Sequence, residues 1–86
     1  LGDVYKRQQY EGLCLRLLEL KKFPETEKWC RRLVQQHGNT LEAYTCQLKL
    51  YFTMGEREKF FQVMQELKQS DVIIDNETLE LIRIFS

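Results

Sequence analysis

The sequence predicts an all-α fold of antiparallel helical hairpins, with about five helices, and three observations lead to this fold class. Apolar residues recur at three- and four-residue spacing along most of the chain, as expected for helices with one buried face. No segment shows sustained strand alternation, and no Asn-Gly or Asp-Gly turn is present. The apolar positions also repeat every 34 residues, a period typical of stacked two-helix units.

The internal repeat becomes visible when the sequence is shifted by 34 positions against itself. A third, partial copy begins near Thr78. We therefore expect one repeat domain over residues 9–86, with units over about residues 9–38 and 39–72 and a partial unit over 73–86. The coinciding pairs are Tyr10 and Tyr44, Cys14 and Leu48, Leu17 and Tyr51, Leu18 and Phe52, Trp29 and Val63, Cys30 and Met64, and Leu33 and Leu67.

The first unit contains two predicted helices. The first runs from Tyr10 to about Lys21, because its apolar residues keep to one helical stripe. The second should cover residues 24–36, because Pro24 suits the first helical position, where its missing N–H costs nothing. His37 follows at the helix end, where an imidazole can bond exposed carbonyl groups. The expected buried residues of the second helix are Trp29, Cys30, Leu33 and Val34.

The second unit should begin directly after that helix. We expect Gly38 to adopt the left-handed conformation that closes a helix. Asn39 is followed by Glu42 three residues later, a spacing that predicts a capping box at the start of the third helix. This helix should end at Met54 and Gly55.

Two more helices complete the prediction. The fourth should cover about residues 57–70, and a short apolar connector should follow over residues 72–74. Asp75 or Asn76 then caps a fifth helix that runs to the end of the chain. The loops between these helices are short, so consecutive helices should pack as antiparallel neighbours.

Composition narrows the classes of partner. Thirteen basic and thirteen acidic residues cancel, so the chain has no overall field that would attract nucleic acid or an anionic membrane. No apolar run approaches the roughly 20 residues that a membrane-spanning helix needs. We therefore expect a soluble, cytoplasmic protein with no membrane partner and no nucleic-acid partner.

The residues that carry chemistry are few. Cys14, Cys30 and Cys46 are odd in number, widely spaced and placed at helical apolar positions, which indicates reduced thiols buried as small hydrophobes. A zinc site needs about four ligands, commonly in close pairs, so we expect no metal. The single histidine has no catalytic signature around it and no phosphate-binding glycine loop is present. We expect no cofactor and no enzymatic activity.

The first residues, LGDVYKRQ, resemble an adapter-derived peptide that opens gene fragments assembled from environmental sequencing. We expect residues 1–8 to be a non-native or disordered leader and exclude them from fold reasoning. The chain is then expected to be an internal or C-terminal fragment of a larger microbial protein. Its end at Ser86 fits either a natural terminus or a second cut.

The pattern resembles the tetratricopeptide repeat (TPR), a family whose 34-residue unit opens its first helix with a bulky aromatic residue. Tyr10 and Tyr44 hold this position, and Tyr51 matches the tyrosine seven residues later. Gly55 matches the glycine that ends the first helix, whereas the first unit has Lys21 there. The resemblance covers about two and a half units and implies a TPR-like α-solenoid fragment.

The second unit departs from that family at the contact between its two helices. The family has small residues at this contact, but here bulky Leu48 faces bulky Phe60. We therefore expect the two helices of the second unit to be splayed apart.

The resemblance implies a non-catalytic scaffold for protein–protein interaction that binds a peptide or a partner domain. Family correspondence places six residues in a concave groove lined by the first helix of each unit. A mixed apolar and charged groove suits an extended or helical peptide, held by Phe52 and oriented by Lys49 and Arg83. The six groove residues are Glu11, Leu15, Thr45, Lys49, Phe52 and Arg83.

Two related families offer alternative functions. Residues 67–82 are similar to the boundary between pentatricopeptide units, which bind single-stranded RNA, and Asp75 and Thr78 match there. That family repeats at 35 residues, and an RNA tract would need basic side chains. Residues 42–55 resemble the helical activator domain found beside winged-helix DNA-binding domains in bacterial transcriptional regulators.

The partial third unit predicts a further contact. Ile82 and Phe85 have no second helix of their own unit to cover them. We expect either neighbouring sequence in the parent protein or self-association of this chain through the exposed C-terminal helix.

Overall fold

A computed structural model describes residues 7–85 of the chain, and residues 1–6 and 86 lie outside the described part. The described part consists of five helices and contains no strand, which confirms the all-α prediction. The first six residues of the expected leader are therefore outside the description, and the first helix begins at Arg7. The helices are α1 (Arg7–Glu19), α2 (Phe23–His37), α3 (Leu41–Met54), α4 (Arg57–Gln69) and α5 (Asn76–Phe85).

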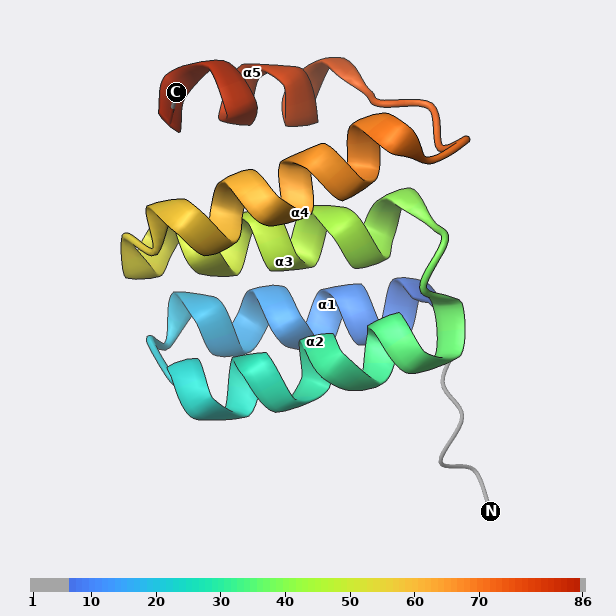
Figure 1. The fold of residues 1–86 in the computed structure, drawn as a ribbon. Helices are drawn as coiled ribbons and strands as arrows, with labels where there is room; N and C mark the ends of the chain where they lie inside the picture. The colour runs from blue at the N-terminus through green and yellow to red at the C-terminus, as the bar shows by residue number, and fades with distance from the viewer. Residues whose placement is uncertain (1–6, 86) are drawn as a thin grey trace.

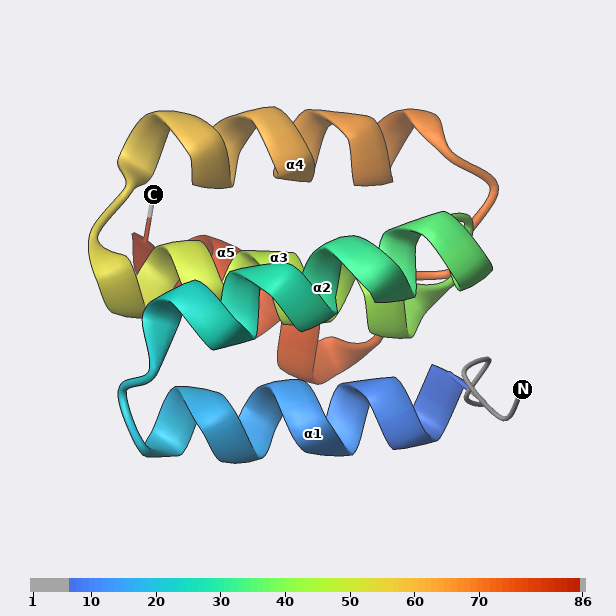
Figure 2. The same cartoon turned by 90° about the horizontal axis from the view of Figure 1, so that it is seen from below.

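The two hairpins and α5 stack in chain order, and consecutive helices run in opposite directions (Figure 1). Helices α1 and α2 form one layer, α3 and α4 the next, and α5 covers the far side. Seen from below, α1 and α4 lie on opposite sides of α2 and α3 (Figure 2). Helix α3 is central, because it contacts each of the other four helices. It therefore carries two separate buried faces.

The turns that follow α1 and α3 have the same backbone conformation. Lys21 and Gly55, which are 34 positions apart, both adopt the left-handed conformation, with φ of 58° and 74°. The next residue in each turn donates its N–H five residues back, from Lys22 to the Leu17 carbonyl at 3.0 Å and from Glu56 to the Tyr51 carbonyl at 2.9 Å. This is the Schellman pattern of helix termination.

The turn between α2 and α3 differs from the prediction. Gly38 has φ of −59° and ψ of −32°, so it continues the right-handed helix and the expected left-handed closure is wrong. Its missing side chain still matters, because a Cβ there would lie 2.5 Å from the Val34 carbonyl oxygen. Thr40, and not Asn39, caps α3: its hydroxyl accepts from the Ala43 N–H at 3.4 Å. Thr40 takes this role because its backbone is extended, as an N-cap requires.

The connector before α5 agrees with the sequence. Residues 72–75 have no regular structure, and Asp75 caps α5 by accepting from the Thr78 N–H at 2.9 Å. Val72 and Ile74 are partly buried against the helices, whereas Ile73 between them is 87% exposed. The connector is thus anchored by alternate side chains.

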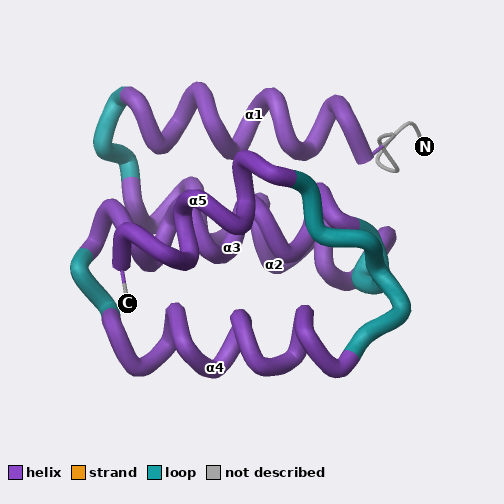
Figure 3. Tube along the Cα trace, turned by 90° about the horizontal axis from the view of Figure 1, so that it is seen from above, coloured by secondary structure: helices purple, strands orange, loops and turns teal. Residues whose placement is uncertain are grey.

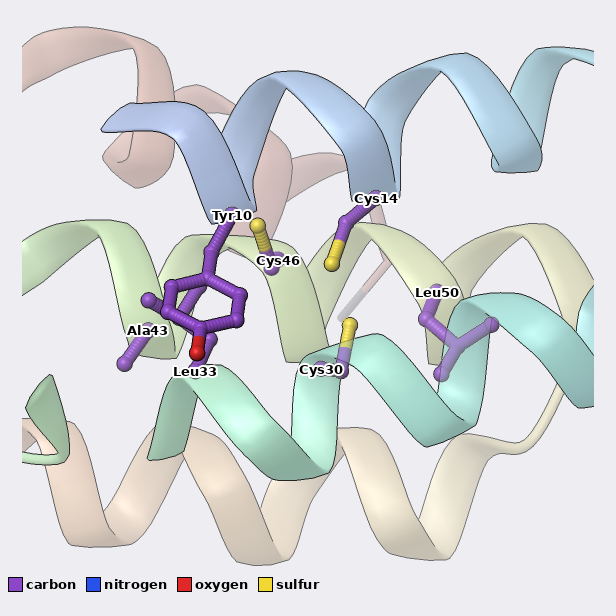
Figure 4. Packing of buried hydrophobic residues seen from close by; sticks show 7 residues of the cluster. All are labelled: Tyr10, Cys14, Cys30, Leu33, Ala43, Cys46 and Leu50. Atoms are coloured by element: carbon purple, nitrogen blue, oxygen red, sulfur yellow. The ribbon is translucent and has the colours of Figure 1, made fainter. Parts of the chain in front are cut away.

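Two clusters of buried residues hold the layers together. The first core lies between α1, α2 and one face of α3, and the second core lies between α3, α4 and α5. Leu33 and Leu67 are both fully buried, each in its own core, but Val34 is exposed, contrary to expectation. The first core is Tyr10, Cys14, Cys30, Leu33, Ala43, Cys46 and Leu50 (Figure 4). The second core is Leu48, Phe60, Val63, Leu67 and Ile82.

The second hairpin is more open than the first, as expected. The backbones of α3 and α4 approach one another over fewer positions than those of α1 and α2. Leu48 and Phe60 are both fully buried, and their bulk holds the two helices apart.

Helix α5 covers the second core with the residues that we expected to be bare. Ile82 is buried against α3 and α4, and the ring of Phe85 packs against the ring of Phe60, with centroids 4.6 Å apart. The expectation that Ile82 lacks cover is therefore wrong, because α5 turns this face inward. Its outward face exposes Leu79 and Ile84.

None of the helices in residues 7–85 combines the length and the apolar content needed to cross a membrane.

Candidate functional site

A surface hollow of about 340 Å³ lies between α1, α3 and the start of α5. Viewed from above, α5 lies over α3, between α1 and α4, so its first turn and the preceding connector form one wall (Figure 3). We call this hollow the acidic groove. Its lining residues are Glu11, Leu15, Leu41, Glu42, Thr45, Lys49, Asp75 and Glu77.

Four of the six residues predicted to line a groove come together here. Glu11 and Leu15 enter from α1, and Thr45 and Lys49 enter from α3. Thr45 is only 7% exposed, and its hydroxyl donates to the Leu41 carbonyl at 2.6 Å. These residues reach one hollow because α1 and α3 lie side by side.

The other two predicted residues lie elsewhere. The Phe52 ring packs against the second core, 5.0 Å from the Phe85 ring and 6.5 Å from the Phe60 ring, measured between centroids. Arg83 lies on the outer face of α5, where its guanidinium pairs with Glu80 beside a separate hollow of about 290 Å³. Neither side chain lines the acidic groove.

Carboxylates dominate the charge of the groove. Among the described residues Lys49 is the one cation in the lining, and its Nζ lies 3.2 Å from Glu77 Oε1. Burial raises the pKa of Glu11, and repulsion from Glu42 raises it further, while Lys49 opposes both effects. The raised pKa of Glu11 thus reflects its partial burial first and the neighbouring carboxylates second. Sequence reasoning missed this acidic character because Asp75 and Glu77 reach the groove only through the position of α5.

The three cysteines form a second group of reactive side chains. They are Cys14 from α1, Cys30 from α2 and Cys46 from α3, and their sulfurs all lie within 4.8 Å of one another. All three are free and buried, as expected, but their wide spacing in the sequence does not keep them apart in the fold. In Figure 4 the sulfurs of Cys14 and Cys30 point toward each other from facing helices. Thiols in such a group can hold a soft metal ion.

A positional signal for this group was present in the sequence. Cys14 and Cys30 are each eight positions from Lys22, and Cys30 and Cys46 are each eight positions from Gly38. Lys22 and Gly38 lie in the two turns that connect α1, α2 and α3. In antiparallel helices, residues equally distant from the turn lie at the same level, and since all three cysteines are on buried faces their side chains converge.

The single histidine lies in the wall of the first core. The His37 ring makes an edge contact with the Tyr10 ring, with centroids 6.0 Å apart.

Comparisons with protein-family models, with curated proteins and with solved structures give no match for this chain. The function must therefore be argued from the geometry.

Proposed function

We propose that the chain is a non-catalytic protein-interaction module, with TPR-like helical hairpins and a cytoplasmic location, whose acidic groove binds a basic segment of a partner protein. The observation that carries this proposal is the convergence of four carboxylates on one hollow with a single lysine among them. Clefts lined by one sign of charge attract segments of the opposite sign.

The groove offers both charge and apolar contact. Glu11, Glu42, Asp75 and Glu77 supply acceptors for lysine or arginine side chains. Leu15 and Leu41 add apolar surface for the aliphatic stems of those side chains. An extended segment with basic residues and small neighbours suits this combination.

The same charges weigh against the RNA-binding alternative. A pentatricopeptide-like surface needs basic side chains to neutralise phosphates, whereas the phosphate backbone would meet four carboxylates here. Lys49 offsets only one of them, because it is paired with Glu77, and three carboxylates are left. A protein partner is therefore the better proposal.

The outward face of α5 supports a second element of the proposal, self-association. Leu79 and Ile84 are 48% and 66% exposed on this helix. Light scattering at increasing concentration tests it: a mass that stays at one chain for both the parent sequence and Ile84→Glu would contradict self-association through α5.

Fluorescence anisotropy with labelled peptides tests the groove. A Lys/Ala peptide should bind, and a Glu/Ala peptide of equal length should not. The double change Glu42→Gln and Glu77→Gln should weaken binding of the Lys/Ala peptide by about tenfold, since two solvent-accessible ion pairs at ~0.7 kcal/mol each sum to ~1.4 kcal/mol. Glu66→Gln, on the exposed side of α4, is the matched control and should leave binding unchanged.

Two outcomes would contradict the proposal. One is equal binding of both peptides, and the other is equal weakening by the groove variant and by the Glu66 control. Rising salt concentration should also weaken binding, because exposed charges are screened within about 8 Å at physiological ionic strength.

A further inference from the structure

The cysteine group combines features that the acidic groove lacks. Each of three consecutive helices contributes one sulfur, and Cys14, Cys30 and Cys46 are 1%, 3% and 2% exposed. No histidine or carboxylate among the described side chains joins the group. The donor set is therefore three thiols and nothing else from this part of the chain.

The spacing of the sulfurs suits a single three-coordinate ion. Sulfurs bonded to one ion at about 2.3 Å, the usual thiolate–metal distance, lie about 4.0 Å apart in a planar arrangement and closer in a pyramidal one. The three sulfurs already lie within 4.8 Å of one another. Closing this difference needs shifts of less than about 1 Å, which side-chain rotation and small helix movements supply.

Charge and coordination number select the class of ion. With three thiolates, a monovalent ion leaves two negative charges, a divalent ion leaves one and a trivalent ion leaves none. The surroundings are apolar, with Leu33 and Leu50 in the same core, so an uncompensated charge would be costly. Zinc is further disfavoured because its structural sites take four ligands.

A surface opening reaches the edge of the group. A hollow of about 200 Å³, whose lining includes Cys30, Gln47 and Tyr51, lies against Cys30. An ion can therefore approach the sulfurs from this side of the helices.

We propose that Cys14, Cys30 and Cys46 form a trithiolate site for a trivalent, three-coordinate thiophilic ion, of which arsenic(III) is the probe. Arsenous acid would react with the three thiols in an exchange without oxidation or reduction. Three As–S bonds form, three As–O bonds break, and the three thiol protons leave with the three hydroxides as water. The neutral product fits an apolar core and joins α1, α2 and α3 through one atom.

Native mass spectrometry of the reduced chain with arsenite tests the stoichiometry. We expect one adduct, heavier by one arsenic atom and lighter by three hydrogen atoms. X-ray absorption at the arsenic edge should show three sulfur neighbours and no oxygen. An adduct that retains oxygen, or that has two sulfurs, would overturn the proposal, and neither measurement depends on a variant that must fold.

Affinity and stability distinguish this site from thiols that merely react. Cys46→Ala should weaken arsenite binding by at least about tenfold, equivalent to ~1.4 kcal/mol, whereas Leu50→Val loosens the same core but keeps all three sulfurs and should bind within about twofold. Arsenite should also raise the thermal midpoint, because it binds the folded chain. A lowered midpoint, or preferential binding of Zn²⁺ or Cu⁺ over arsenite, would overturn the proposal.

Discussion

Helices α1 and α2 pack through small side chains, whereas α3 and α4 pack through large ones. Cys14, Thr26 and Cys30 lie at the buried contacts of the first hairpin, and Leu48 and Phe60 lie at those of the second. The turns and the 34-residue spacing of these positions are shared. The size of the side chains therefore decides how closely each pair of helices approaches.

This difference also explains where the three sulfurs can meet. Helices that approach closely bring short side chains from opposite sides into contact, as the first core does with its cysteines. In the second hairpin the positions equivalent to Cys14 and Cys30 hold Leu48 and Met64, and the rings of Phe52, Phe60 and Phe85 pack together there. The first hairpin thus provides two of the three sulfurs, whereas the second core is aromatic.

The largest expected effect comes from a charge in the second core. Leu67→Asp should cost at least about 3 kcal/mol, because it leaves a cavity and buries an unpaired carboxylate. Leu67 is fully buried, so the variant should lose its cooperative helical unfolding transition in circular dichroism. Lys68→Asp, on the exposed neighbour, is the control, and equal loss in both variants would contradict the buried placement.

A smaller effect tests the role of side-chain size directly. Thr26→Phe gives the first hairpin the residue that the second has 34 positions later, Phe60. Because Thr26 is 1% exposed in the close-packed hairpin, overpacking should cost about 1–3 kcal/mol in urea unfolding. The sulfurs should also separate, so arsenite binding should weaken. Thr53→Phe, at an exposed position of α3, should change neither property.

The two matched turns should respond in opposite directions. Lys21 holds the left-handed conformation that Gly55 holds in the second hairpin. Lys21→Gly should stabilise the chain by up to about 1 kcal/mol, whereas Gly55→Ala should destabilise it by about 1 kcal/mol. Thermal unfolding checks both changes. Shifts of the same sign would show that the turns are not equivalent.

The smallest effects on stability concern the acidic groove. Lys49 and Glu77 form an exposed pair, so Lys49→Ala should change the free energy of unfolding by less than about 0.5 kcal/mol. The same variant should bind the Lys/Ala peptide more tightly, because it frees Glu77. Weaker binding would contradict the proposed charge of the groove.

Binding to the groove should depend on pH through Glu11. Its folded-state pKa is raised, mainly by burial, so it becomes neutral at a higher pH than an ordinary glutamate does. Affinity for the Lys/Ala peptide should therefore begin to fall above the usual glutamate range as the pH is lowered. Glu11→Gln should bind more weakly at neutral pH and remove this part of the pH profile.

The helices could be predicted from the sequence because their signals are local. The 3.6-residue periodicity, together with Pro24 and Gly55, predicts the four connections between the five helices to within a few residues of where the structure has them. The cap of α3 could not be chosen this way, since Asn39 and Thr40 are both good caps and the geometry of the turn favours Thr40.

The candidate site could be predicted less completely from the sequence, because it depends on how separate helices pack against one another. Thr45 and Lys49 were predicted from the resemblance to the repeat family, and both line the groove. Phe52 was predicted in the same way, but its ring packs against Phe85 of α5, a contact that depends on packing in three dimensions. The cysteine group is intermediate between these cases. The equal spacing of the cysteines from Lys22 and Gly38 can be read from the sequence. The sulfurs meet, however, only because small residues let the helices approach.

Nuclear Overhauser contacts between the β-protons of Cys14, Cys30 and Cys46 in the reduced chain test most directly whether the first hairpin packs closely against α3. Cross-peaks for all three pairs are the predicted result, because the sulfurs lie within 4.8 Å of one another. Cross-peaks from Cys14 to residues of α4 instead, or none among the cysteines, would contradict this arrangement of the helices.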